Sequence, residues 1–324
     1  MQGKIAMEEH FALADTFTNT KRFSTGMSDD LRRRLMDIHD IRLGEMDEFG
    51  IELAIQSLNA PGVQSVVEVD KAVDLAQRAN DILAEEVARR PDRFAGFAAL
   101  PLQDPDAAIV ELTRCIKELG FKGTMVNGFT HQGDPESVIY YDLPQYRPFW
   151  ASVEELDMPF YLHPRNPLPA RMQNLQGHPW LENSPWAFAM ETAVHALRLM
   201  GSGIFDQFPN LKLVLGHLGE RIPFDLWRVD HRIKKSPQGI PAKQTMRYYM
   251  QNNVHLTTSG NFNDPTFHCT VAEVGMDRIL FSVDYPFETT SDAAVWFDNM
   301  EMDEADRLAV GRTNAIELFK LNML

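Results

Sequence analysis

Several features are scarce in this 324-residue chain, and each scarcity excludes a class of protein. The chain has two cysteines, Cys115 and Cys269. They are too few for a disulfide scaffold or a cysteine-rich zinc module, and they suit a reducing compartment. No run of about 18 apolar residues occurs, so no transmembrane helix is predicted. The opening MQGKIAMEEHF reaches charged residues at once and lacks the apolar stretch of a signal peptide. We therefore expect a cytoplasmic protein.

Positive charge is also scarce. The chain has 31 Lys and Arg residues against 46 Asp and Glu residues, which gives a formal net charge of −15. This balance argues against general nucleic-acid binding. The glycine-rich phosphate loops G-x-G-x-x-G and G-x-x-x-x-G-K-[ST] are absent, and we expect no organic cofactor. An acidic surface still permits an anionic substrate, because a metal ion and local cations outweigh net charge.

What the chain does contain is typical of a globular enzyme. It is 44% hydrophobic and 24% charged, and it is long enough to bury a large core. Its length fits one α/β barrel of about 250 residues with loop insertions. We therefore expect a single domain over residues 1–324.

Eight short runs have the composition of buried β-strands. They are mostly apolar on both faces, as strands of a parallel sheet should be. In chain order they are Lys4–His10, Ile51–Leu58, Phe94–Pro101, Phe121–Asn127, Pro159–His163, Leu211–His217, Val254–Gly260 and Ile279–Asp284.

Helical patterns alternate with these runs. Residues Asp70–Arg90 carry one apolar stripe and stop before Pro91, which cannot continue a helix. Further helices are predicted over Pro105–Gly120, Trp186–Met200 and Asp303–Phe319, with Asp104 as the N-cap of the first. This alternation predicts a (β/α)₈ TIM barrel, with an open doubly wound sheet as the alternative. Two long connections, 11–50 and 164–210, are the loop insertions.

In such a barrel, functional side chains stand at the carboxyl ends of the strands. The first run ends with Glu8 and His10, the fifth with His163 and the eighth with Asp284. Glu8 and His10 are two residues apart and point to the same face of their strand. Two imidazoles and two carboxylates suit Zn²⁺ or Mn²⁺, with coordination positions left open for a substrate. The pattern therefore predicts a catalytic metal site.

Each of these residues has a structural alternative when it is taken alone. A histidine at a strand end is commonly a hydrogen-bonded structural residue. Asp284 precedes Tyr285-Pro286 and could cap the next helix. Glu9 should face away from Glu8, and we interpret it as structural. The coincidence of four metal-competent residues at strand ends favours the metal site.

The sixth run continues into GHLGE, which contains His217 and Glu220. A carboxylate can fix the tautomer of an imidazole and raise its basicity. The alternative is a tight turn with no chemical task.

These segments together resemble the amidohydrolase superfamily. They are the E-x-H start, FYLHPRNP (160–167), LGHLGE (215–220), LTTSGNF (256–262) and ILFSVDYPFE (279–288). More narrowly, the chain resembles the metal-dependent decarboxylases related to aminocarboxymuconate-semialdehyde decarboxylase, especially the γ-resorcylate (2,6-dihydroxybenzoate) and 2,3-dihydroxybenzoate decarboxylases. The resemblance covers residues 1–321.

Individual segments favour different members of that branch. YYDLPQYRPFW (140–150), ETAVHALRLM (191–200) and NPLP (166–169) are more similar to the γ-resorcylate type. DYPFETTSDA (284–293) is more similar to the 2,3-dihydroxybenzoate type. His10 favours the γ-resorcylate type, because some 2,3-dihydroxybenzoate enzymes lack a histidine there.

The resemblance implies a role for each candidate residue. One divalent ion, Zn²⁺ or Mn²⁺, would be held by Glu8, His10, His163 and Asp284. The catalytic residues would be Asp284, His217 and Glu220. The substrate-binding residues would be Phe23, Asn127, Arg228 and Phe287. From the residues alone, Asn127 could equally bond the backbone and Arg228 could lie at an interface. Three further aromatic residues could close the mouth or line a subunit interface: Trp180, Trp186 and Tyr146.

The resemblance also implies a reaction and an assembly. The reaction is the non-oxidative decarboxylation of an ortho-hydroxybenzoate, reversible in bicarbonate: 2,6-dihydroxybenzoate to resorcinol, or 2,3-dihydroxybenzoate to catechol. The assembly is a homodimer or homotetramer, with no nucleic-acid or membrane partner. Two alternatives remain: a metal-dependent lactone or amide hydrolase of the same superfamily, and a silent barrel that binds no metal.

Overall fold

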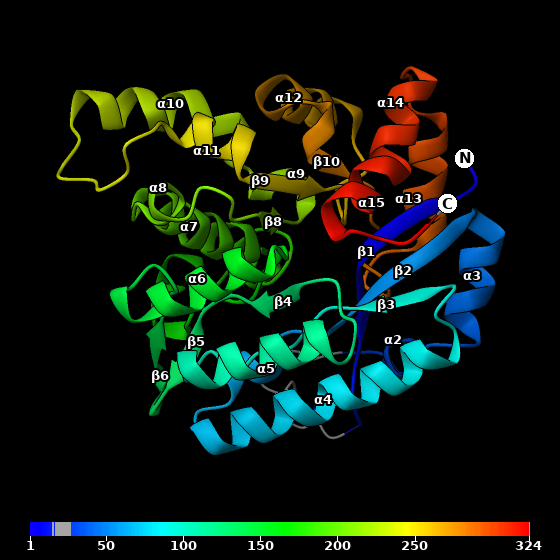
Figure 1. The fold of residues 1–324 in the computed structure, drawn as a ribbon. Coiled ribbons are helices and arrows are strands. Elements are labelled where there is room, and N and C mark those ends of the chain that lie inside the picture. The colour runs from blue at the N-terminus through cyan, green and yellow to red at the C-terminus, as the bar shows by residue number, and fades with distance from the viewer. Residues whose placement is uncertain (15, 17–26, 324) are drawn as a thin grey trace.

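Short parallel strands form two arcs in the computed structural model, which describes residues 1–14, 16 and 27–323 (Figure 1). The first arc has the order β1 (Lys4–Phe11), β2 (Ile51–Leu58) and β3 (Phe94–Gly96). The second has the order β10 (Ile279–Leu280), β9 (Val254–Thr257), β8 (Leu213–Leu215), β7 (Phe160–His163) and β4 (Thr124–Asn127). Within the described residues, these strands lie in all eight of the predicted runs.

Isolated parallel bridges join the two arcs at both ends. Ala98, which follows β3, pairs with Thr124 at the start of β4. Glu9 in β1 pairs with Tyr285, which follows β10. The strands are therefore linked in a ring, as in the predicted (β/α)₈ barrel and unlike the alternative open sheet.

Alternation along the strands separates two apolar cores. Ala6 and Ala54 pack outward against the helices, whereas Ile5, Leu53 and Ile55 belong to a separate inner cluster. The inner cluster also contains Phe319 of the last helix, whose ring lies 5.3 Å from that of Phe97. Apolar side chains therefore fill the inside of the ring, and the polar cluster described below lies at the carboxyl ends of the strands.

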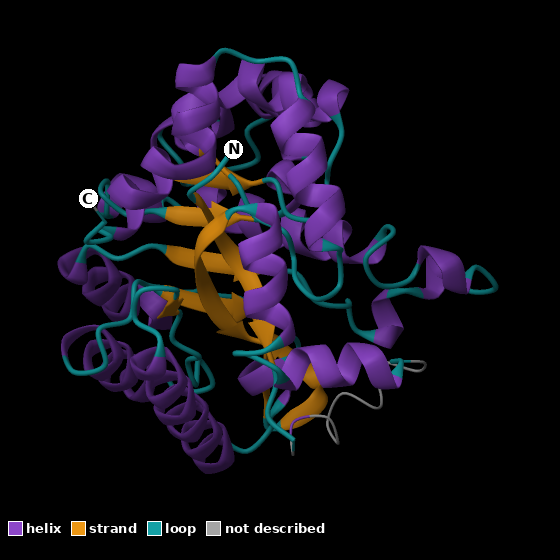
Figure 2. Cartoon of the chain, turned by 90° about the vertical axis from the view of Figure 1, so that its right-hand side faces the viewer, coloured by secondary structure: helices purple, strands orange, loops and turns teal. Residues whose placement is uncertain are grey.

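Helices surround the strands (Figure 2). Those on the N-terminal half are α2 (Asp29–Met36), α3 (Ile41–Phe49), α4 (Val69–Arg89), α5 (Pro105–Lys117) and α6 (Arg147–Leu156). Those on the C-terminal half are α7 (Ala187–Gly201), α8 (Ile204–Gln207), α9 (His217–Glu220), α10 (Ile222–Lys235), α11 (Met246–Asn252), α12 (Asp264–Val274), α13 (Thr290–Asn299), α14 (Glu304–Leu308) and α15 (Asn314–Phe319). None of the helices in the described residues is both long and apolar enough to cross a lipid bilayer.

The predicted helices form for the expected local reasons. The carboxylate of Asp104 accepts hydrogen bonds from the backbone N–H groups of Asp106 and Ala107, which caps α5. The apolar stripe of α4 is buried, and this helix ends two residues before Pro91. The helix predicted over Asp303–Phe319 is interrupted, because a π-helical turn separates α14 from α15.

Several elements were not predicted, among them α2 and α3 in the connection 11–50 and a hairpin after β4. The chain after β4 forms an antiparallel hairpin of β5 (Thr130–Gln132) and β6 (Asp134–Ile139). Most of β6 is exposed, so its sequence carries no buried apolar run that would have indicated a strand.

Candidate active site

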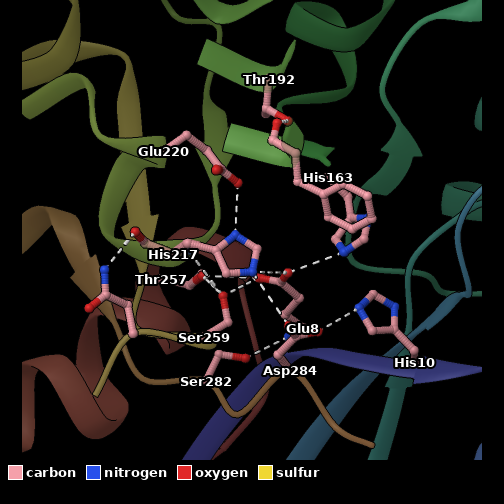
Figure 3. Close-up of polar contacts among 12 residues, drawn as sticks. Glu8, His10, His163, Thr192, His217, Glu220, Thr257, Ser259, Ser282 and Asp284 are labelled. Atoms are coloured by element: carbon pink, nitrogen blue, oxygen red, sulfur yellow. Dashed lines mark hydrogen bonds and ion pairs between the residues drawn. The ribbon is translucent and has the colours of Figure 1, made fainter. Parts of the chain in front are cut away.

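The structure brings together the four residues predicted to bind a metal ion. Glu8, His10, His163 and Asp284 each offer one ligand atom, and these atoms all lie within 4.8 Å of one another (Figure 3). Nε2 of His10 lies 3.2 Å from Oδ1 of Asp284, and Nε2 of His163 lies 3.3 Å from Oε1 of Glu8. The cluster joins β1, β7 and the segment after β10, which are far apart in sequence.

The donor atoms of this cluster suit a divalent cation. Among the described residues, Oε1 of Glu8, Nε2 of His10 and Oδ1 of Asp284 are buried and make no hydrogen bond. Buried polar atoms without partners are costly, and native proteins rarely keep them. Two imidazole nitrogens with two carboxylate oxygens are ligands that Zn²⁺ and Mn²⁺ accept. The residues present therefore fit the ion that the sequence predicts.

The backbone of β1 fixes the first two of these side chains. The pairing of β1 with β2 shifts register between Ala6 and Glu9, so the strand is irregular where Glu8 lies. The hydroxyl of Ser282 accepts the N–H of Glu8 at 2.7 Å. The hydroxyl of Ser57 lies 3.1 Å from Nδ1 of His10, which leaves Nε2 of that ring facing the cluster.

Glu9 points to the backbone of another segment instead of the cluster, in agreement with its predicted structural role. Its Oε1 accepts hydrogen bonds from the N–H of Val283 at 3.1 Å and from the hydroxyl of Ser282 at 3.3 Å. Burial raises the pKa of Glu9 to about 8, against the lowering effect of Arg42.

Two catalytic candidates lie beyond their strands instead of at the strand ends. The strand β8 ends at Leu215, and His217 follows with a φ of 53°. The strand β10 ends at Leu280, and Asp284 follows with a φ of 76°. Left-handed backbone is uncommon for residues other than glycine, and it concentrates at functional sites. Asp284 does not cap the next helix, since the side chain of Thr289 caps α13.

The side chains of His217 and Glu220 form a pair at the edge of the cluster. Nδ1–H of His217 donates to Oε1 of Glu220 at 2.7 Å. Nε2 of His217 lies 3.4 Å from Oδ2 of Asp284 and 3.7 Å from Oε1 of Glu8. Burial lowers the pKa of His217, but the carboxylates of Glu220, Glu8 and Asp284 outweigh burial and raise it well above its usual value. The turn therefore directs Nε2 of this imidazole at the cluster.

Burial and neighbouring charges also shift the pKa values of Glu8 and His10. Burial raises the pKa of Glu8, but His217, His163 and His10 together hold it well below the usual range. Burial lowers the pKa of His10. Glu8 is thus ionised and His10 is neutral, which are the protonation states that a metal site requires.

A cavity of about 290 Å³ opens onto the cluster. His163, His217 and Asp284 form part of its wall, and Phe287, which is 44% exposed, forms another part. The other described residues that line it are Met27, Asn59, Ala60, Pro61, Pro164, Arg165, Asn166, Asn183, Ser184, Phe188 and Glu288. The ring of Phe287 lies edge-on to His10, with 5.7 Å between ring centroids. The cavity has the size and the aromatic wall that a single-ring ligand needs.

Of the other predicted substrate-binding residues, Asn127 and Arg228 are not among the described residues that line this cavity. Phe23 is outside the described residues. Asn127 is buried, and its Nδ2 donates to the carbonyl oxygen of Leu58 at 3.3 Å, which is the backbone alternative. Arg228 is exposed on α10 and is not among the described lining residues. The substrate-binding roles of Phe23, Asn127 and Arg228 stay predictions.

The three aromatic residues left open by the sequence have separate locations. Tyr146, whose role the sequence left open, lies in the core: it is 1% exposed, and its hydroxyl donates to the carbonyl oxygen of Leu102 at 2.6 Å. Trp186 lies beside the guanidinium of Arg221, at 3.5 Å from the ring centroid. Trp180 is 63% exposed.

Sequence reasoning missed several polar residues around the cluster. Arg165 is buried and lines the cavity, and it donates to the carbonyl oxygen of Phe129 at 2.8 Å. Tyr161, Thr257 and Ser259 are buried, and their hydroxyl groups contact Glu8. Polar side chains within or just after apolar strand runs were the available signal.

A ring of parallel strands with histidines and carboxylates at its mouth defines a metal-dependent α/β-barrel enzyme. The Amidohydrolase family model matches residues 7–321, and the chain belongs to this family. The superfamily predicted from the sequence is confirmed.

Curated relatives are similar over their full length. The chain is 56% identical to "Gamma-resorcylate decarboxylase" of Rhizobium sp. over 99% of both chains. It is 57% identical to "Gamma-resorcylate decarboxylase" of Rhodococcus jostii, over 99% of this chain and 100% of the relative.

Solved structures of similar proteins have the same fold. A 2,6-dihydroxybenzoate decarboxylase in complex with 2,6-dihydroxybenzoate has a TM-score of 0.96 at 56% identity, over 99% of this chain and 100% of that chain. A dihydroxybenzoic acid decarboxylase of Polaromonas sp., with manganese and the inhibitor 2-nitroresorcinol, has a TM-score of 0.96 at 52% identity, over 100% of this chain and 98% of that chain. The predicted fold class is confirmed.

Proposed function

We propose that this protein decarboxylates 2,6-dihydroxybenzoate to resorcinol and CO₂, and that the reaction reverses in excess bicarbonate. The observation that carries the proposal is 56% identity to γ-resorcylate decarboxylases over 99% of the chain. The cluster of two imidazoles and two carboxylates at the cavity supports it. The preference for the 2,6 isomer over the 2,3 isomer follows four curated relatives with identities of 54% to 57%, which share the name "Gamma-resorcylate decarboxylase".

We propose Glu8, His10, His163 and Asp284 as ligands of one divalent ion, Zn²⁺ or Mn²⁺. When bound, the ion supplies Lewis-acid polarisation of a phenolic and a carboxylate oxygen of the substrate. The manganese in the Polaromonas structure favours Mn²⁺. Metal analysis of protein purified without added metal tests the identity of the ion.

The proposed chemistry avoids an aryl carbanion. Asp284 accepts the proton of the ortho phenol and delivers it to the ring carbon that carries the carboxylate. The bond to the carboxylate carbon then breaks, its electron pair restores the aromatic ring, and CO₂ leaves. A solvent proton neutralises the product phenolate. The position of Asp284 supports its proposed role in proton transfer. Asp284 and His217 both line the cavity, and Nε2 of His217 lies 3.4 Å from Oδ2 of Asp284.

His217 and Glu220 are proposed to position the reacting carboxylate. The imidazolium donates Nδ1–H to Glu220, which leaves Nε2–H as the donor facing the cavity. Because Glu220 already holds the imidazole of His217 in place, this donor loses little conformational entropy when the substrate carboxylate binds. Phe287 offers an apolar edge to the substrate ring.

A panel of substrates tests the function. The metal-loaded protein is offered 2,6-dihydroxy-, 2,3-dihydroxy- and 2-hydroxybenzoate, and CO₂ and the phenol are measured. The control is 4-hydroxybenzoate, which lacks an ortho hydroxyl group. We expect the highest kcat/KM for 2,6-dihydroxybenzoate and no turnover of the control. A higher kcat/KM for the 2,3 isomer contradicts the substrate assignment, and lactone hydrolysis without CO₂ release contradicts the reaction.

The remaining sequence predictions concern assembly and location. We propose that residues 1–324 act as one domain in a homodimer or homotetramer. Phe224 and Trp227 of α10 support an oligomer, because they are 83% and 63% exposed. Light scattering measures the mass in solution, and a monomer contradicts this proposal. Cytoplasmic location and the absence of nucleic-acid or membrane partners stay predictions.

A further inference from the structure

Three buried hydroxyl groups surround one oxygen of Glu8. The hydroxyls of Tyr161 and Ser259 donate to Oε2, and Thr257 lies 3.2 Å from the same atom. The four side chains are fully buried. Thr257, Ser259 and Glu8 appear together in Figure 3. The other carboxylate oxygen, Oε1, makes no hydrogen bond in the described chain and lies 3.3 Å from Nε2 of His163.

The three hydroxyl groups suit a carboxylate at residue 8. They would not suit an imidazole, which is the other kind of ligand group among the four candidate ligands. A carboxylate oxygen accepts two or more hydrogen bonds, whereas an imidazole nitrogen accepts one. The hydroxyl oxygen of Thr257 also lies 2.8 Å from that of Tyr161 and 2.6 Å from that of Ser259, but its single proton goes to Oε2 of Glu8. Every hydroxyl proton therefore has an acceptor when residue 8 is an ionised glutamate.

A glycine makes room for this arrangement. A Cβ atom at Gly216 would lie 3.2 Å from Oε1 of Glu8 and 2.8 Å from Oε2, and the second distance is shorter than real Cβ contacts. A side chain at residue 216 would therefore push the carboxylate of Glu8 out of this position.

Ser259 links Glu8 to the catalytic histidine. Its Oγ accepts the backbone N–H of His217 at 3.3 Å while its own proton goes to Glu8. His217 has a left-handed backbone and relies on such contacts to hold its position. In the described chain, the hydroxyls of Tyr161 and Thr257 contact Glu8 and neighbouring hydroxyl groups and make no comparable bond to His217.

We propose that Tyr161, Thr257 and Ser259 form a hydroxyl cradle that holds Glu8 with Oε1 turned toward the ion, and that Ser259 couples Glu8 to His217. They are positioning residues, and the proposal rests on the metal site proposed above. The cradle explains why residue 8 is a glutamate: three donors converge where a carboxylate oxygen must lie. Removal of one donor lets the carboxylate rotate and weakens its hold on the ion.

Metal titration of single variants tests the cradle. Apo protein of Tyr161→Phe, Ser259→Ala and the wild type is titrated with Mn²⁺ alone, and bound Mn²⁺ is followed by electron paramagnetic resonance. We expect about 10-fold to 100-fold weaker binding in both variants. Tyr146→Phe is the matched control, since it also loses a buried hydroxyl bond but lies in the core. Its affinity for Mn²⁺ should equal that of the wild type, although its melting temperature falls.

Two further comparisons separate positioning from loss of stability. Thr257→Val should weaken Mn²⁺ binding and Thr257→Ser should restore it, because only serine keeps the hydroxyl. At saturating Mn²⁺, Tyr161→Phe should regain the kcat of the wild type. Ser259→Ala should keep a lowered kcat, because the backbone N–H of His217 has lost its acceptor, Oγ of Ser259.

The outcomes distinguish a failure of the hydroxyl cradle from a failure of the proposed decarboxylation. A wild type that binds Mn²⁺ but does not release CO₂ overturns the proposed reaction and leaves the cradle standing. A wild type that binds Mn²⁺ no better than Tyr161→Phe and Ser259→Ala overturns the cradle. A wild type that binds neither Mn²⁺ nor Zn²⁺ overturns both.

Discussion

Nδ1 of His217 lies 2.7 Å from Oε1 of Glu220, and both residues have a left-handed backbone, with φ of 53°. A regular helix would not place these side chains in this way, because left-handed residues turn the chain back on itself. The GHLGE turn therefore places Nε2 of His217 3.4 Å from Oδ2 of Asp284.

The substitution Glu220→Gln should lower kcat about 10-fold to 100-fold, because the amide keeps the shape but removes the charge that stabilises the imidazolium. Steady-state CO₂ release and metal content are measured together, and metal content should not change. Glu191→Gln is the control, since Glu191 is also buried but bonds Tyr140. An unchanged kcat in Glu220→Gln would show that Glu220 is only structural.

The substitution Asp284→Asn should reduce turnover by a factor of about 10² to 10⁴, because the amide cannot carry the proton to the ring carbon. The amide oxygen remains a weak ligand, so metal is partly retained. The measurement is kcat at saturating Mn²⁺, with bound metal determined on the same sample. Full activity with full metal content would refute the proton transfer by Asp284.

Removal of the metal should abolish activity and lower stability. The chelated protein should lose CO₂ release, and Mn²⁺ or Zn²⁺ should restore it. Since the ion binds only the folded cluster, metal at 100 times its Kd should add about 2.7 kcal/mol to the free energy of unfolding. Thermal melts at increasing Mn²⁺ measure this gain, and Glu8→Gln should respond far less. A melting temperature independent of Mn²⁺ in the wild type would contradict the metal site.

Much of the fold could be predicted because it depends on local patterns. Continuous apolar runs predicted the parallel strands, and Asp104 with Pro105 predicted the start of α5. The cluster of four candidate ligands could be predicted because the carboxyl ends of the strands and the segments that follow them converge at one end of a barrel. The hairpin β5–β6 could not, since its exposed residues carry no pattern that differs from a loop.

The parts of the site that could not be predicted depend on contacts between segments far apart in the sequence. Tyr146 is aromatic and could have lined the mouth or an interface, but only the packing places its hydroxyl against the carbonyl oxygen of Leu102 in the core. Asn127 ends an apolar strand, yet its amide turns to a carbonyl group. The hydroxyls of Tyr161 and Ser259 meet Glu8 over sequence separations of 153 and 251 residues, which no local signal reveals.

A histidine outside the active site should make the protein sensitive to acid. His195 of α7 is fully buried, and its Nε2 accepts the N–H of Tyr141 at 3.3 Å. Burial, with a smaller effect of Arg198, lowers the pKa of His195 to about 3. In the unfolded chain the same group titrates near about 6.5. Between these values the unfolded state binds one more proton, so the free energy of unfolding falls as the pH falls from about 6.5 toward 3. Above pH 6.5 this residue has no effect on the pH dependence.

The substitution His195→Gln keeps an acceptor for the N–H of Tyr141 but removes the titration. Urea unfolding at pH 6.5 and 4.5 should show that the wild type loses about 2.3 kcal/mol more than the variant over this interval, since the unfolded histidine is already half protonated at pH 6.5. Other acid-sensitive groups, such as buried His255, contribute equally to both proteins and cancel in the difference. Parallel losses in the two proteins would mean that His195 accepts a proton without unfolding, and that its burial does not keep it neutral.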